Sequence, residues 1–227
     1  SDVCSSDLRT VKRIRKVMDN IKPGCILDLH SNTGFSKGPA NQYAEYFPYI
    51  DKLWFGESFM YSNMPPENWL VEVSGIPFGL MGDMLHAGGN RWLGMVYGMT
   101  LRLPWLTEGV TCDPRPVWKI WDEFGIESSE MSGYWEKDCP VKTSNPHVLA
   151  TVYLKEGKSL VSVGNWAEKP ETFSLQFDWK KLGIDHAKAV LEPPEIRDFQ
   201  KKAVFHTGEQ ILVGPKEGLL LFLSENE

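Results

Sequence analysis

The sequence predicts an α/β region followed by an all-β region, namely the last part of a (β/α)8 TIM barrel and then a C-terminal antiparallel β-sandwich. Up to about residue 102, short apolar runs alternate with segments of helical periodicity, which is typical of a parallel sheet covered on both faces. This unit repeats about three times, too few for a closed barrel but a fit to its last three units. From about residue 134, short alternating runs are separated by turn residues, which indicates a sandwich.

These patterns place a domain boundary near residue 130. We expect the end of the barrel over residues 9–130 and the sandwich over residues 131–227. An open doubly wound sheet is the alternative for the first region, but no GxGxxG motif follows either of its first two strands, so a dinucleotide site has no support.

The first eight residues are expected to lie outside the fold. Residues 1–8 read SDVCSSDL, lack any periodicity, and resemble translated sequencing adapter rather than protein. On this interpretation the natural sequence begins within a helix, near Arg9, and an N-terminal part of the same polypeptide is missing.

In the first region, apolar residues at spacings of three and four predict an amphipathic helix over residues 9–21, ended by Pro23 and Gly24. Buried strands are expected at residues 25–29 and 52–55, which are apolar runs followed by polar residues and glycine. The other elements are a short helix, a helix that Pro66 opens, a glycine-broken apolar stretch and a last helix, over residues 41–49, 66–73, 76–85 and 91–100.

The second region begins after a proline-rich linker over residues 104–116 with a helix over residues 117–124. Alternation then predicts six short strands, over residues 148–154, 159–165, 172–179, 187–191, 210–213 and 218–223.

The composition excludes several classes of function. The 227 residues are 42% hydrophobic and carry a formal net charge of -6, so the chain offers no basic surface for nucleic acid. No apolar run approaches the roughly 18 residues that a membrane helix needs. The four cysteines and five histidines show no metal-ligand spacing. We therefore expect no nucleic-acid partner, no membrane insertion, no metal and no cofactor.

The aromatic content points instead to carbohydrate. Seven of the nine tryptophans fall between Trp54 and Trp135, and flat aromatic rings stack on the apolar faces of sugars while carboxylates and amides bind hydroxyls. The alternative for any single tryptophan is an ordinary core residue, because tryptophan is highly buried on average.

Two carboxylates are the catalytic candidates, since reactive groups in parallel α/β folds lie at the carboxyl ends of strands. Glu57 directly follows the strand over residues 52–55, and Asp28 lies within the strand over residues 25–29. Aromatic neighbours of Glu57 favour a protonated general acid. For Asp28 the alternative is a buried acid satisfied by a neighbouring backbone group or arginine.

The candidate substrate-binding residues come from the same loops. They are His30, Asn32, Trp54, Tyr61, Asp83 and Asn90. The alternatives are ordinary turn chemistry for His30 and Asn32, and an N-cap role for Asn90. Asp122 and Glu123 form the only adjacent Asp-Glu pair, and helical periodicity places them on a solvated helix edge.

Several blocks of this sequence resemble large bacterial glycoside hydrolases of the family 123-like group. The blocks are WFGE at residues 54–57, PENWLVEVSGIPFGLMGD at 66–83, GGNRW at 88–92, YGMT at 97–100, WDEFG at 121–125, GYW at 133–135 and NW at 165–166. The resemblance implies an upstream β-domain, a (β/α)8 barrel and a C-terminal β-sandwich, and a periplasmic or extracellular location.

The resemblance also implies a chemistry. Characterised members are β-N-acetylgalactosaminidases in which the substrate's acetamido group reacts, assisted by an adjacent Asp-Glu pair within the barrel. Asp122 and Glu123 fall after the expected barrel, so this role is not transferred to them. We expect a glycosidase that acts on glycans, N-acetylhexosaminides among them, by carboxylate-assisted hydrolysis, and we expect the fragment alone to be inactive. The alternative is a non-catalytic carbohydrate-binding or structural module.

Overall fold

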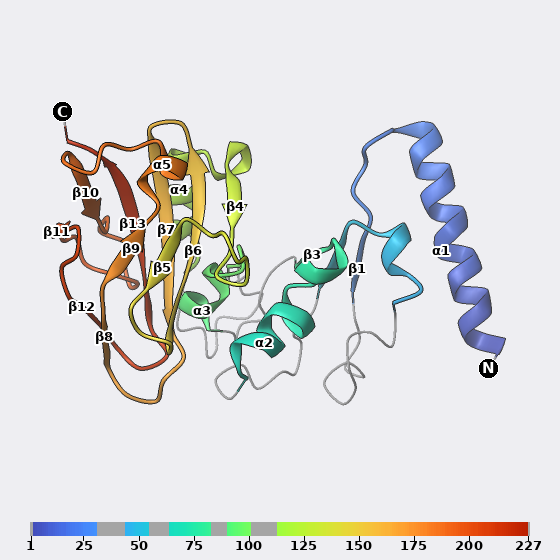
Figure 1. Ribbon diagram of the computed structural model, residues 1–227. Coiled ribbons are helices and arrows are strands. Elements are labelled where there is room, and N and C mark those ends of the chain that lie inside the picture. The colour runs from blue at the N-terminus through green and yellow to red at the C-terminus, as the bar shows by residue number, and fades with distance from the viewer. Residues whose placement is uncertain (1, 31–43, 55–63, 83–89, 101–112, 227) are drawn as a thin grey trace. The chain divides into compact units, whose positions relative to one another are not determined.

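The computed structural model describes residues 2–30, 44–54, 64–82, 90–100 and 113–226 (Figure 1). Contacts along the chain divide it into two compact units, Ser1–Gly89 and Asn90–Glu227. No helix among the described residues is long and apolar enough to cross a membrane.

The first unit contains a three-stranded parallel sheet, as the apolar runs predict. The strands are β1 (Asp28–His30), β2 (Lys52–Trp54) and β3 (Met81–Gly82), in the order β1-β2-β3. The helical segments between them are α1 (Asp2–Ile21), α2 (Pro66–Asn68), a π-helical turn at Trp69–Val73, and 3₁₀ turns at Phe47–Tyr49 and Ile76–Phe78. Pro66 opens α2 as expected.

One face of this sheet carries the small core of the unit. Buried Phe47, Ile50 and Leu80 pack with Leu29 of β1 and Val11 of α1. Because successive residues of a strand point to opposite faces, Asp28 lies on the other face from Leu29.

The edge of the sheet where the strands begin is tied to α1 by an ionic clamp. Asp51 Oδ2 accepts hydrogen bonds from Leu27 N and from Arg15 Nη1, each 2.7 Å long, and Arg15 Nη2 donates to Cys25 O at 2.7 Å. The Leu27 amide, followed by the Arg15 guanidinium, holds the pKa of Asp51 below its ordinary value. This carboxylate has a structural role, because its oxygen is committed to holding α1 and two strands together.

Two expectations for this unit need correction. The first helix begins at Asp2 rather than near Arg9, since residues 2–8 continue the helical path. The run over residues 25–29 is not a buried strand: only Asp28–His30 pairs, Ile26 is 60% exposed and Asp28 is exposed. The described neighbours cover one face of β1 and leave the other open.

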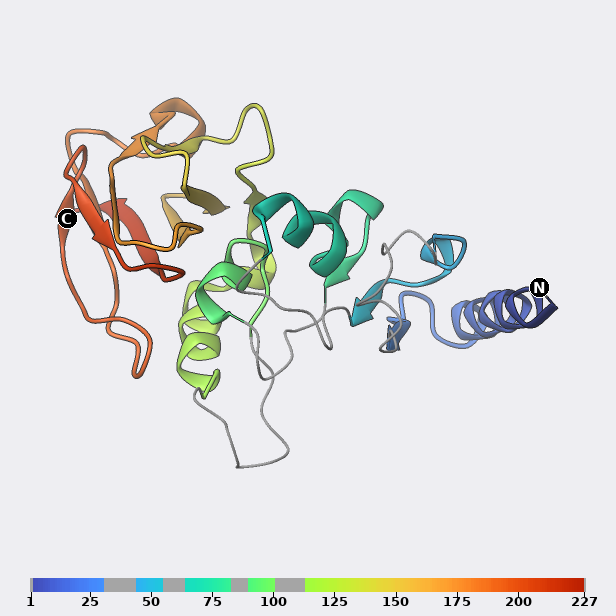
Figure 2. The same ribbon diagram turned by 90° about the horizontal axis from the view of Figure 1, so that it is seen from below.

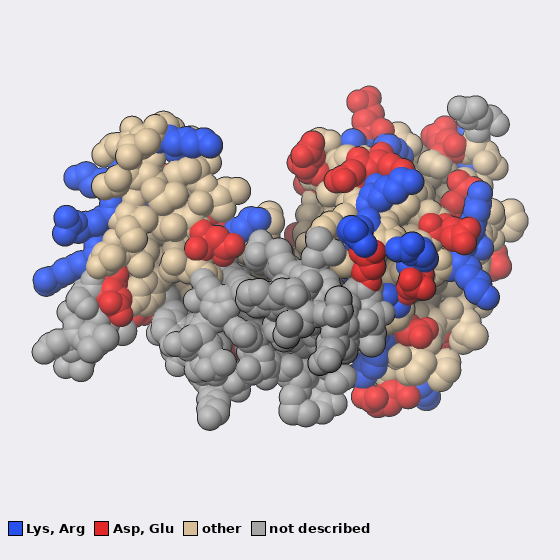
Figure 3. All heavy atoms as spheres, turned by 180° about the vertical axis from the view of Figure 1, so that it is seen from behind, with Lys and Arg blue, Asp and Glu red and all other residues tan. Residues whose placement is uncertain are grey.

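On the view in Figure 3, lysine and arginine side chains gather along the outer side of α1.

The second unit is built on a six-stranded antiparallel sheet of order β11-β10-β13-β7-β6-β4. Its strands are β4 (Glu130–Ser132), β6 (Val148–Lys155), β7 (Lys158–Asn165), β10 (Ala189–Glu192), β11 (Phe205–His206) and β13 (Gly218–Glu225). Two antiparallel ribbons accompany it, β5 (Val141–Thr143) with β9 (Leu175–Phe177), and β8 (Glu171–Phe173) with β12 (Ile211–Val213).

Alternation along the long strands supplies two separate cores. Val161 and Leu221 pack with the two ribbons on one face, while Leu160 and Leu220 pack with helices on the other. The helices are α3 (Arg91–Met95) and α4 (Arg115–Phe124), which lie together on one side of this unit in Figure 2. A short helix, α5 (Trp179–Leu182), follows β9.

The antiparallel texture after residue 134 is confirmed, with differences in detail. The run expected at residues 172–179 is broken into β8, β9 and α5, because Asp178 caps α5 by accepting a hydrogen bond from Lys181 N. The last helix of the first region ends at Met95, before Gly98 adopts a φ of 73°. The two ribbons are separate two-stranded sheets among the described residues, so a complete sandwich remains a prediction. The domain boundary near residue 130 also remains a prediction. The helices α3 and α4, which precede that residue, share a core with the antiparallel sheet.

Candidate functional site

The three parallel strands end at one edge of the sheet. Their last residues are His30, Trp54 and Gly82, and the Cα atoms pair in register as His30 with Trp54 and Leu53 with Gly82. The chain therefore leaves the same edge three times, as active-site loops do in α/β enzymes.

The predicted loop residues follow these strand ends closely in the chain. Asn32, Glu57 and Asp83 come two, three and one residues after the ends of β1, β2 and β3. These three residues and Tyr61 lie outside the described residues. The parallel register brings the ends of the three strands to a common edge.

Three residues in register lie in a row across the open face of the sheet. Asp28, Lys52 and Met81 are Cα partners on the three strands, and Met81 is 60% exposed. Opposite charges thus lie in register on β1 and β2, two residues before the strand ends. Asp28 is accessible on this face, so its expected burial is wrong, and it is the first residue of β1, two residues before the strand ends.

Sequence reasoning missed Lys52 and Met81. The signal was available, because period-two alternation places residue 52 on the open face once Leu29 is assigned to the core. Because Leu53 and Trp54 are apolar, the run over residues 52–55 was interpreted as a buried strand, and the position of Lys52 on the open face was not predicted.

Asn90 has the capping role that its position before a helix indicated. Its Oδ1 accepts from Trp92 N at 3.0 Å and from Leu93 N at 2.9 Å, and its Nδ2 donates to Lys216 O at 2.7 Å. Both polar atoms are engaged within the second unit, which leaves the side chain poorly suited to bind substrate.

The adjacent pair Asp122 and Glu123 lies on an exposed side of α4, as expected for a solvated helix edge. Glu123 is 3.5 Å from Lys119 one turn earlier. The opposite side of α4 packs Val117, Ile120 and Phe124 into the core, so neither carboxylate enters an enclosed site.

Comparison with protein families assigns both regions of the chain. Residues 1–104 match the family description "Glycoside hydrolase 123, TIM-barrel domain", and residues 113–224 match "Glycoside hydrolase 123, C-terminal domain". The chain belongs to glycoside hydrolase family 123. The resemblance noted in the sequence is thereby confirmed.

Three solved structures are similar to this chain, and the first of them agrees with it at the level of fold. A noncanonic maltogenic alpha-amylase from Thermotoga neapolitana matches 96% of this chain over 59% of its own, with a TM-score of 0.55 and 12% identity. A GH27 β-L-arabinopyranosidase from Geobacillus stearothermophilus matches 97% of this chain over 55% of its own, with a TM-score of 0.45 and 15% identity. A GH30 endoxylanase from Clostridium papyrosolvens matches 96% of this chain over 61% of its own, with a TM-score of 0.44 and 13% identity.

The chain spans between 55% and 61% of the length of these solved structures. A comparison with functionally curated proteins finds no significant match.

Proposed function

We propose that this family 123 chain forms part of a glycosidase that hydrolyses glycans, N-acetylhexosaminides among them, at the edge where β1, β2 and β3 end. The observation that carries the proposal is the parallel register of the three strands, whose last residues come shortly before Asn32, Glu57 and Asp83 in the sequence. Membership of a glycoside hydrolase family supports the reaction class.

Glu57 is the proposed general acid. Glycoside hydrolysis needs a carboxylic acid to protonate the leaving oxygen and a second group that stabilises the oxocarbenium-like transition state. Asp28, accessible on the open face of β1, is the proposed second carboxylate. A short separation between two carboxyl groups, about 5 to 5.5 Å, favours a covalent retaining route, whereas about 6.5 to 9.5 Å favours inversion.

The remaining residues are proposed to hold the sugar. His30 and Trp54 stand at the strand ends, and Asn32, Tyr61 and Asp83 belong to the loops that follow. Aromatic rings supply stacking surfaces for sugar faces, and amide or carboxylate groups bind hydroxyls. Asn90 is left out of this set, because its amide is committed to α3 and to the Lys216 carbonyl.

The barrel itself requires more strands than the described residues contain. Three parallel strands are paired here, within the described ranges, whereas a (β/α)8 barrel closes with eight. Met81 on the open face of β3 and Ile26 just before β1 are each 60% exposed. We infer that further strands of the complete protein cover them, and that the 227-residue chain alone lacks glycosidase activity.

The experiment that tests the proposed reaction is an assay of the complete protein on two matched sets of aryl β-glycosides, with and without a 2-acetamido group. Release of the aryl alcohol from the acetamido set alone supports hydrolysis of N-acetylhexosaminides. Release from both sets supports a broader glycosidase with a carboxylate nucleophile. No hydrolysis of either set, with retained binding of the sugars, contradicts the proposal and favours the non-catalytic module.

A further inference from the structure

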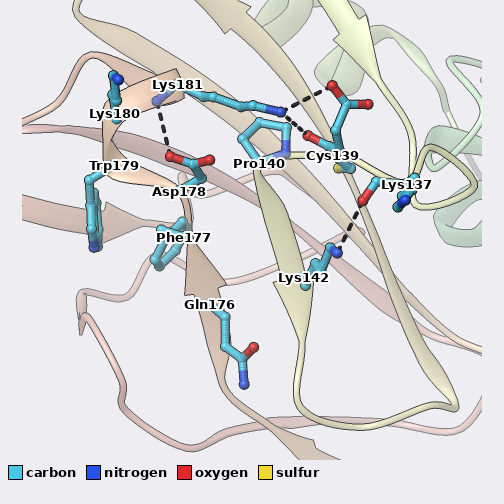
Figure 4. A pocket seen from close by; sticks show the side chains of 11 residues that line it. Lys137, Cys139, Pro140, Lys142, Gln176, Phe177, Asp178, Trp179, Lys180 and Lys181 are labelled. Carbon is cyan, nitrogen blue, oxygen red and sulfur yellow. Dashed lines mark hydrogen bonds and ion pairs between the residues drawn. The ribbon is translucent and has the colours of Figure 1, made fainter.

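The second unit contains two adjoining pockets that the proposed catalytic edge does not use. One has a volume of about 710 Å³ and is lined by residues 137–140, Lys142 and residues 176–181 (Figure 4). The other, of about 470 Å³, is lined by residues 134–137, 141–143, 145–146 and 148–150. Lys137 and Lys142 line both pockets, so the two form one continuous surface beside the β5–β9 ribbon.

Each end of this surface carries a pair of aromatic rings. Phe177 and Trp179 lie side by side with ring centroids 4.6 Å apart, and Tyr134 and Trp135 form an edge contact at 5.2 Å. All four side chains are half-buried, so part of each ring remains accessible. Half-exposed aromatic pairs at two separated points suit a ligand that has several flat, partly apolar faces, as a saccharide has.

The aromatic pair at the second pocket is held in place. The Trp135 ring stacks on Tyr97 at 5.7 Å and 7°, and the Tyr134 hydroxyl lies 3.0 Å from the Tyr97 hydroxyl. A Cβ at position 133 would lie 2.2 Å from the Trp135 ring, so glycine is required for the ring to fold back over the chain there. A ligand at this end would therefore meet a pre-organised surface, which lowers the entropic cost of binding.

Lysines also line this surface. Four lysines and three carboxylates line it, Lys137, Lys142, Lys180, Lys181, Glu136, Asp138 and Asp178. In a chain with a net charge of -6, this is a local excess of cations.

The carboxylates on this surface are committed to the protein. Lys181 Nζ lies 3.0 Å from Asp138 Oδ2, Asp178 caps α5, and Glu136 accepts a hydrogen bond from Ser132 Oγ at 2.6 Å. Lys137, Lys142 and Lys180 have no carboxylate within ion-pairing distance among the described residues. The Lys142 ammonium donates only to the Lys137 carbonyl, at 3.2 Å, in the described structure.

We propose that this surface binds an anionic saccharide, one that bears carboxylate or sulfate groups. The lysine ammonium groups would form charge-assisted hydrogen bonds with the anionic substituents, the aromatic pairs would contact sugar faces, and exposed Gln176, in register with Lys142 on the neighbouring strand, would bind hydroxyls. A neutral glycan leaves the three lysines without partners. Single-stranded nucleic acid also stacks on aromatic rings, and its binding is one of the outcomes that the test below distinguishes.

This surface belongs to the second unit and the proposed catalytic edge to the first, so its test is a binding measurement on the 227-residue chain that needs no hydrolysis. Isothermal titration calorimetry compares three probes of equal length: a sulfated or uronate-containing oligosaccharide, a neutral N-acetylhexosamine oligosaccharide and a single-stranded oligodeoxynucleotide. The proposal expects the anionic saccharide to bind at least about tenfold more tightly than the others, with an affinity that falls as salt rises. Equal or absent binding of the anionic saccharide, or tighter binding of the nucleic acid, would overturn it.

Two variants locate the binding surface. Lys142→Ala combined with Lys180→Ala is expected to weaken binding about tenfold or more, while Lys201→Ala combined with Lys202→Ala, which removes the same charge from exposed positions outside both pockets, leaves it within about twofold. Equal losses in the two double variants would show non-specific charge attraction and refute the site.

A third variant tests the aromatic contact. Trp179→Leu keeps an apolar side chain against the core but removes the flat ring, and is expected to weaken binding about fivefold while the protein stays folded. Unaltered affinity in this variant would show that the ring does not contact the ligand. If the variant unfolds, Gln176→Ala, at an exposed position on the same ribbon, replaces it with the same expected direction.

Discussion

At the scale of single residues, neighbouring acids and amides of this chain have very different tasks. Asp51 and Asn90 are committed to the fold through short hydrogen bonds to backbone groups, whereas Asp28 is exposed at the first position of β1. The residue type does not determine which of these roles a side chain has. The backbone groups that surround each side chain determine it.

Asn90 offers a direct test at this scale. Asn90→Ala removes the cap of α3 and the tie to the Lys216 carbonyl, and should lower the free energy of unfolding by about 1 kcal/mol, within the usual range of about 0.5 to 2. Asn90→Ser keeps a capping oxygen and should recover part of that loss. Urea denaturation measures both variants, and equal stability of Asn90→Ala and the unchanged protein would remove the structural role.

Asp113 makes the second residue-scale prediction. Its hydrogen bonds from the Arg115 side chain and backbone, reinforced by Arg197, lower its pKa to about 2, below the roughly 3.9 of an unfolded aspartate. A depressed pKa in the folded state stabilises the fold above the unfolded pKa, and this contribution is lost as the pH falls toward 2.

The measurement compares urea unfolding of the unchanged protein and Asp113→Asn across this range. The difference between the two should be constant from pH 7 to 5 and shrink between pH 4 and 2. A difference that stays the same at pH 2.5 would show that ionisation of Asp113 does not contribute.

At the scale of elements, periodicity predicts the long segments well and the short ones poorly. The strands β6, β7 and β13 appear where alternation places them, since each is eight residues long and contributes side chains on its two faces to two different cores. The three-residue strands β4 and β5 and the two-residue β11 carry too few residues for a period to emerge. The π-helical turn at Trp69–Val73 is likewise invisible to a pattern based on 3.6 residues per turn.

The two cores of the second unit provide an element-scale prediction. Leu221 is fully buried between β13 and the ribbons, so Leu221→Ala should destabilise the protein by about 2 to 5 kcal/mol through lost burial and a cavity. Leu212→Ala, at a position that is 69% exposed, is the control and should change stability by less than about 0.5 kcal/mol. Similar losses in both variants, measured by chemical denaturation, would contradict this assignment of the core.

At the scale of the whole molecule, the order of an α/β region and an antiparallel region follows from the sequence, and so does the family. The candidate site follows only in part. Parallel register places the strand ends His30, Trp54 and Gly82 at one edge of the sheet, which the strand-end rule anticipates, but the exposure of Asp28 depends on which face of the sheet the rest of the fold covers. The adjoining pockets of the second unit arise from residues about 40 positions apart in the chain, such as Lys142 and Trp179, and no local pattern joins them.

The most direct test of the central claim is the rate of glycoside hydrolysis by the complete protein with Glu57→Gln, compared with the control Glu67→Gln on the exposed first turn of α2. Glutamine keeps the shape of Glu57 but removes the proton that a general acid supplies. The account predicts that kcat falls by about 10²- to 10⁴-fold, the range of a lost acid-base group, while substrate affinity is retained and the control keeps full activity. A Glu57→Gln protein whose kcat and affinity both stay within about twofold of the unchanged enzyme would contradict a catalytic site at this edge of the sheet.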